Sequence, residues 1–135
     1  MNARKIIFWC ARLIAAAIML QTLYFKFSGA EESVYISTQM GIEPWGRIGT
    51  GVMELVASLL IIVPTTVWLG AILGIGLMSG AIMSHLTVLG IEVKGDGGQL
   101  FFYALAVLIC STLALWLSKD TWPSFVKNLL PKAIQ

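Results

Sequence analysis

The sequence contains few charged residues, and this scarcity excludes several classes of protein. Only 12% of its 135 residues are Asp, Glu, Lys or Arg, against about 25% in an ordinary soluble domain. The net charge of +2 comes without a basic cluster, so we expect no nucleic-acid partner. Hydrophobic residues make up 58% of the chain, and the mean hydropathy is +0.86. A soluble chain of this length could not bury so much apolar surface, so the expected solvent is a lipid bilayer.

Cysteine and histidine are also scarce, which argues against several kinds of reactive site. The two cysteines, Cys10 and Cys110, lie in apolar runs and form neither a CxxC motif nor a secreted disulfide pattern. We expect both to be buried free thiols. The one histidine, His85, stands near Glu92 and Asp96 without the HxxxH or HxxE spacing of a metal site. We therefore predict no metal.

Long apolar runs dominate the chain, and four of them are long enough to cross a bilayer as helices. The expected spans are residues 6–27, 44–63, 66–89 and 100–117. Pro44 suits the first position of the second span, Pro64 ends that span, and Thr65 or Thr66 can cap the third. The predicted fold class is all-α: an integral membrane four-helix bundle with short loops. It occupies residues 1–119 and is followed by a tail, 120–135.

The tail has its own pattern. Trp122, Phe125, Val126, Leu129 and Leu130 recur at helical spacing with Lys127 and Lys132 among them, which predicts an amphipathic helix on the membrane surface.

The distribution of basic residues predicts the orientation of the chain. Five of them lie on the side that carries both termini: Arg4, Lys5, Lys119, Lys127 and Lys132. The other side has only Lys26, Arg47 and Lys94, beside five acidic residues. Both termini should therefore face the cytoplasm. A cleaved signal peptide is the alternative for the first span, but that apolar run is too long and contains Arg12.

An acidic residue, Glu54, lies in the middle of the second span. A charge at this depth costs about 2.5–3.5 kcal/mol and should turn inward to a partner. Counted at about 1.5 Å per residue from the cytoplasmic ends, Glu54 lies near the midplane and Arg12 somewhat below it. We therefore predict an Arg12–Glu54 ion pair between the first two spans.

A second set of polar residues gathers in the outer half of the bundle. Lys26, Arg47, His85 and Gln99 come from four different spans and fall at similar depths. They form a candidate ligand pocket. Two other interpretations stay open: the basic side chains can extend to the lipid head groups, and His85 can serve as an interfacial hydrogen-bonding residue.

Several segments, taken in order, resemble the DoxX and DoxX-like family of membrane proteins. They are Arg12, YFKFSGA at 24–30, EPWGRIGTGVMELVASLLIIVP at 43–64, GAIMSHLTVLGIEV at 80–93 and DGGQLF at 96–101. The resemblance implies a four-helix protein of the bacterial inner membrane. The family is named after a subunit of a thiosulfate:quinone oxidoreductase, and its relatives are linked to redox and oxidative-stress systems. By position, the family's polar residues here are Arg12, Lys26, Glu54 and His85.

Two functions follow as hypotheses. The first is a redox-associated subunit, without an independent catalytic motif, whose polar pocket takes a quinone head group or another small molecule. The second is a scaffold or assembly partner in which the Arg12–Glu54 pair is purely structural. Its partners would be a membrane redox protein or further copies of the chain. A transporter is less well supported, because the sequence shows neither a repeat nor a broken helix.

Overall fold

Helices make up the whole architecture of the computed structural model, which describes residues 2–129 and contains no strand among them. In chain order they are α1 (Ala3–Ser28), α2 (Glu31–Gln39), α3 (Trp45–Ile62), α4 (Val67–Ser84), the π-helical η1 (His85–Leu89), α5 (Gln99–Leu117), the short 3-10 helix η2 (Lys119–Thr121) and α6 (Ser124–Leu129). Within the described residues four helices are long and apolar enough to cross a membrane: α1, α3, α4 with η1, and α5. The all-α membrane bundle is therefore confirmed.

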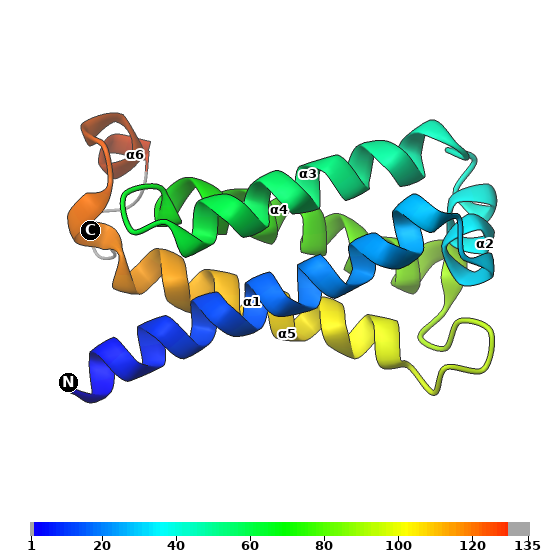
Figure 1. Ribbon diagram of the computed structural model, residues 1–135, viewed down its shortest axis with the longest axis horizontal. Coiled ribbons are helices and arrows are strands. Elements are labelled where there is room, and N and C mark those ends of the chain that lie inside the picture. The colour runs from blue at the N-terminus through cyan, green and yellow to red at the C-terminus, as the bar shows by residue number, and fades with distance from the viewer. Residues whose placement is uncertain (1, 130–135) are drawn as a thin grey trace.

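The four long helices form a closed ring. Contacts join α1 to α3, α3 to α4, α4 to α5 and α5 back to α1. The beginning of α1 and the short helix α6 lie at one end of the bundle, and α2 and the loop between η1 and α5 lie at the other (Figure 1). Because α2 also contacts α1, α3 and η1, it covers the second end.

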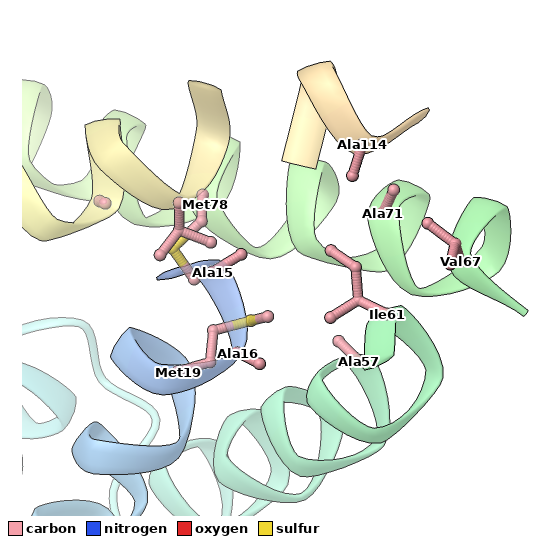
Figure 2. Packing of buried hydrophobic residues seen from close by; sticks show 11 residues of the cluster. Ala15, Ala16, Met19, Ala57, Ile61, Val67, Ala71, Met78 and Ala114 are labelled. Carbon is pink, nitrogen blue, oxygen red and sulfur yellow. The ribbon is translucent and has the colours of Figure 1, made fainter. Parts of the chain in front are cut away.

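Small side chains fill the centre of the bundle (Figure 2). The buried cluster contains Ala15, Ala16 and Met19 from α1, Ala57 and Ile61 from α3, Val67, Ala71 and Met78 from α4, and Ala104, Val107 and Ala114 from α5. Lipid removes the hydrophobic driving force between helices, so close backbone approach and dispersion must hold them together. Alanine and glycine at the contacts permit that approach.

Gly70 marks the tightest contact between α3 and α4. A Cβ at this position would lie 2.4 Å from the backbone nitrogen of Ile61 and 2.9 Å from the backbone oxygen of Ala57. Neither atom can move without displacing α3. Glycine is therefore required here by packing.

The four long helices begin and end within three residues of the predicted spans, but two expected features at helix starts differ. Pro44 precedes the first residue of α3 rather than occupying it. Thr66 does lie at the N-cap of α4, but its hydroxyl donates 2.8 Å to the carbonyl of Leu60. It therefore satisfies a carbonyl of α3 that the helix end leaves free.

Other expectations were wrong. The link between the first two spans is longer than a short loop and contains the helix α2. Cys10 was expected to be buried, but it is exposed on the outside of the isolated chain, while Cys110 is half-buried. An apolar side chain on that surface can be covered by lipid instead of protein.

The tail was predicted as an amphipathic helix. In α6 and the turn before it, Trp122 and Val126 are buried against the bundle, whereas Phe125 and Leu129 are exposed. The indole of Trp122 donates to the carbonyl of Leu115 at 3.1 Å. Leu130 and Lys132 lie outside the described residues. The domain boundary at residue 119 stays a prediction.

Candidate functional site

Arg12 is fully buried, but it does not contact Glu54. Its Nε donates 2.8 Å to the carbonyl of Ile61, and its Nη2 donates to the carbonyl of Ile62. These carbonyls belong to the last turn of α3, where intrahelical partners run out. The guanidinium also lies 4.0 Å from the ring centroid of Trp9. Arg12 thus closes the C-terminal end of α3.

Glu54 does face the interior, with only 6% of its side chain exposed, but its cationic partner is Lys26. The Nζ of Lys26 lies 2.5 Å from Oε1 of Glu54, and the hydroxyl of Thr22 lies 3.0 Å from Oε2. The same hydroxyl is 2.8 Å from the carbonyl of Met19 and donates its one proton to one acceptor at a time. Thr22 and Lys26 are four residues apart, so they share one face of α1.

The predicted Arg12–Glu54 pair was therefore wrong, and the reason is the register of α1 against α3. The depth estimate counted upward from Lys5 in the first span and from Pro64 at the end of the second, and it assumed that these two residues lie at the same depth. The observed bonds place Arg12 level with Ile61 and Ile62, which follow Glu54 by about two turns, or roughly 10 Å. Free carbonyls lie within reach of the guanidinium, so it has no cause to extend farther.

Arg47 forms a second charged group just above the first. Its guanidinium pairs with Glu43 four residues earlier, with Nη2 2.9 Å from Oε1, and its Nη1 donates to the carbonyl of Lys26. Arg47 therefore joins the beginning of α3 to the end of α1. The Arg47 side chain is only 11% exposed, so it does not extend freely into the head groups.

A cavity of about 560 Å³ lies between the helices next to these groups. Its walls come from α1, α2, α3, α4, η1 and α5, and they are mainly apolar. The sequence-predicted pocket residues Lys26, Arg47, His85 and Gln99 all lie on it, together with Glu54. Arg12 does not line it. The volume falls within the range of about 300–1,000 Å³ typical of small-molecule sites.

His85 is buried at the start of η1 and is held by the loop that follows. Its Nδ1 lies 2.8 Å from the carbonyl of Gly90, and its ring packs edge-on against Phe101 with centroids 5.6 Å apart. His85 and Gly90 stand five residues apart in the chain, at the two ends of the π-helical turn. This turn brings the Gly90 carbonyl to the imidazole. Such turns are frequent at functional sites.

Two polar side chains near the start of α5, one turn apart, add to the cavity wall. The amide nitrogen of Gln99 donates to the hydroxyl of Tyr103 at 2.9 Å. Both residues line the cavity, and Tyr103 was not singled out from the sequence. Its position four residues after Gln99 is the signal that could have identified it.

The loop before α5 is fixed by Asp96. Its carboxylate accepts hydrogen bonds from the backbone N–H groups of Val93, Gly98 and Leu100 at 2.8–3.2 Å. Burial alone would raise the pKa of Asp96, but these hydrogen bonds lower it below its usual value. Asp96 therefore positions the loop whose Gly90 carbonyl holds His85. Within residues 2–129, no cluster of three His, Cys, Asp or Glu side chains could hold a metal.

The comparison with family models gives one result. The model of the DoxX-like family matches residues 10–114, which is most of the chain. The chain belongs to the DoxX-like family. Neither the curated proteins nor the solved structures contain a significant match to it. The matched region of this DoxX-like protein covers α3 and α4 completely, most of α1 and α5, and every polar residue of the cavity described above.

The arrangement has clear chemical consequences for this DoxX-like protein. Its cavity combines hydrogen-bonding side chains from several helices with mainly apolar walls. The cations Lys26 and Arg47 are each paired with a carboxylate. The site can therefore form hydrogen bonds with a polar ligand while carrying little net charge of its own.

Proposed function

We propose that this DoxX-like protein binds a small, lipid-soluble molecule with a polar ring, such as a quinone, as the membrane subunit of a redox system. The observation that carries this proposal is the 560 Å³ cavity, in which apolar walls meet a limited set of hydrogen-bonding side chains. A ligand with a polar head and an apolar body matches such a site.

The charges around the cavity favour a neutral ligand. Lys26 is paired with Glu54, and Arg47 with Glu43, so a charged ligand would have to break an existing ion pair. Glu32 on α2 adds a negative charge at the outer rim, which disfavours anions. A neutral ring with one or two oxygen atoms meets neither obstacle.

The redox association and the cellular location are further parts of the proposal. Both follow from what the family resemblance implies. We place the chain in the bacterial inner membrane with both termini in the cytoplasm, because the side that carries the termini is richer in lysine and arginine. The beginning of α1 and α6 lie at the same end of the bundle, which is consistent with this orientation (Figure 1).

The methionine methyl groups allow a direct test of binding. Met19, Met40 and Met78 line the cavity, whereas Met53 and Met83 are exposed elsewhere. We expect decylubiquinone, added to ¹³C-methyl-methionine protein in lipid nanodiscs, to cause saturable NMR shifts at the first three only. Shifts that do not saturate, or that appear equally at all five, would contradict the proposal.

A pair of variants sharpens the test. Ala81 lines the cavity, and Ala106 is similarly half-buried on α5 but does not line it. Ala81→Leu should weaken binding by about tenfold because it fills space that the ligand needs, and Ala106→Leu should leave binding unchanged. Equal effects from the two substitutions would mean that the ligand binds elsewhere.

A structural scaffold is the second candidate, supported by a different observation. Both carboxylate oxygens of Glu54 have partners on α1, and Arg12 ties α1 to the end of α3. These charges hold helices together whether or not a ligand binds. Under this hypothesis Lys26→Met/Glu54→Leu should fold and retain its partner proteins on purification from native membranes, and quinone should give no saturable shift.

A further inference from the structure

The hydrogen bond between His85 and Gly90 fixes the tautomer of the imidazole. Nδ1 lies 2.8 Å from the carbonyl oxygen of Gly90, and a carbonyl oxygen can only accept. Nδ1 must therefore carry a proton. In the neutral ring the other nitrogen, Nε2, is then unprotonated and is a hydrogen-bond acceptor.

Nε2 of His85 has no hydrogen-bond partner within residues 2–129, although the residue is only 5% exposed. One edge of the ring is committed to Gly90, and Phe101 packs against the ring at an interplanar angle of 72°. His85 lines the cavity. Among residues 2–129 the only buried side-chain nitrogen or oxygen without a partner is the Ser111 hydroxyl. Nε2 is therefore accessible from the cavity, and a ligand that supplies a donor there gains one hydrogen bond.

We propose that the cavity selects ligands with an aromatic hydroxyl group, which donates its hydrogen bond to Nε2 of His85. This proposal rests on the proposed function and specifies its ligand class: a phenol or a quinol, bound in preference to the corresponding quinone. A carbonyl oxygen placed at Nε2 would bring two acceptors together, and neither would be satisfied. The hydroxyl of a quinol supplies the missing proton.

The hydroxyl of Tyr103 also favours a ligand with a hydroxyl group. The hydroxyl of Tyr103 accepts a hydrogen bond from Gln99 at 2.9 Å and keeps its own proton to donate. Tyr103 lies on the same cavity. A ligand hydroxyl can both donate to Nε2 and accept from a donor such as Tyr103, whereas a carbonyl can only accept.

The tautomer can be measured without any ligand. Because the chain contains one histidine, ¹⁵N-histidine labelling of untagged protein gives two ring nitrogen signals that need no further assignment. We expect Nδ1 to show the shift of a protonated nitrogen and Nε2 that of an unprotonated one. The opposite tautomer would overturn the inference and would leave the proposed cavity binding intact.

Ligand selectivity is measured with 4-hexylphenol and its methyl ether, 4-hexylanisole, which differ in the hydroxyl proton. We expect the phenol to bind about fivefold more tightly, the ratio given by one hydrogen bond between neutral groups. The ratio should fall to about one in His85→Phe and persist in Ser84→Ala. Ser84 also lines the cavity, but its hydroxyl already donates to the carbonyl of Gly80.

The outcomes separate this inference from the proposed function. If neither compound shifts the methyl signals of the cavity methionines, the proposed function fails. If both bind equally to the unmodified chain, only the inference about His85 fails. This comparison requires no variant, so it stands even if His85→Phe does not fold. Decylubiquinol compared with decylubiquinone then shows whether a quinol, rather than a simple phenol, meets the same preference.

Discussion

Removing the ammonium group of Lys26 should destabilise the bundle, because it leaves Glu54 without its cation. Only 6% of the Glu54 side chain is exposed, and loss of one partner from a buried ion pair costs about 3–5 kcal/mol. We expect Lys26→Met to fall at the lower end, about 3 kcal/mol, because the Lys26 side chain keeps 24% exposure and the pair is therefore partly open to solvent.

The double variant distinguishes the cost of an unpaired charge from the value of the pair itself. Lys26→Met/Glu54→Leu removes both charges, so it should lie within about 1 kcal/mol of the unmodified chain, as replacement of a buried pair by apolar residues often does. Unfolding by increasing SDS in mixed micelles gives the free energies. Lys5→Met, on the exposed first turn of α1, is the matched control and should change little.

Two results would refute this reasoning. The first is a Lys26→Met variant as stable as the control variant, since Glu54 would then not need its cation. The second is a double variant as unstable as the single one. That outcome would mean that the cost arises from lost packing of the lysine stem rather than from an unpaired carboxylate.

Three further predictions concern other parts of the fold. Arg12→Met should lower the free energy of unfolding by about 2–3 kcal/mol in the same SDS assay, because two carbonyls at the end of α3 lose their donor. A variant as stable as the unmodified chain would mean that water or lipid replaces the guanidinium as donor. Gly70→Ala should cost about 1–3 kcal/mol because its Cβ would meet backbone atoms, whereas Gly49→Ala, with nothing within 4 Å, should not destabilise. The folded-state pKa of Asp96 is lowered, so its stabilisation is present above its unfolded-state pKa of about 3.9 and is lost as the pH falls through the lowered value. Thermal unfolding between pH 6 and pH 2 should therefore show a smaller loss of stability for Asp96→Asn than for the unmodified chain.

The sequence located the polar side chains of the cavity better than it located their partners. Lys26, Arg47, His85 and Gln99 were grouped from their estimated depths, and all four line the same cavity. A depth estimate that is wrong by one helical turn can still assign a residue correctly to a cavity that many residues line. An ion pair tolerates no such error, because its two atoms must meet within 4 Å. The partner of Glu54 was therefore assigned wrongly.

Local features that depend on the backbone were beyond the reach of composition. The helix α2 is weakly hydrophobic and was expected to be part of a short loop. The tautomer of His85 depends on a carbonyl that a π-helical turn brings to its ring. Hydropathy averaged over a span contains neither piece of information.

The sequence by itself determined that this chain is an all-α membrane bundle with four spans, because hydrocarbon requires long apolar helices whose backbone groups are satisfied within each helix. It also determined that Glu54 must turn inward, since a carboxylate facing lipid is too costly. Only the tertiary structure decided which cation meets Glu54, what Arg12 binds and which edge of His85 remains available. Those outcomes depend on the register and rotation of packed helices, which close backbone contacts such as the one at Gly70 constrain.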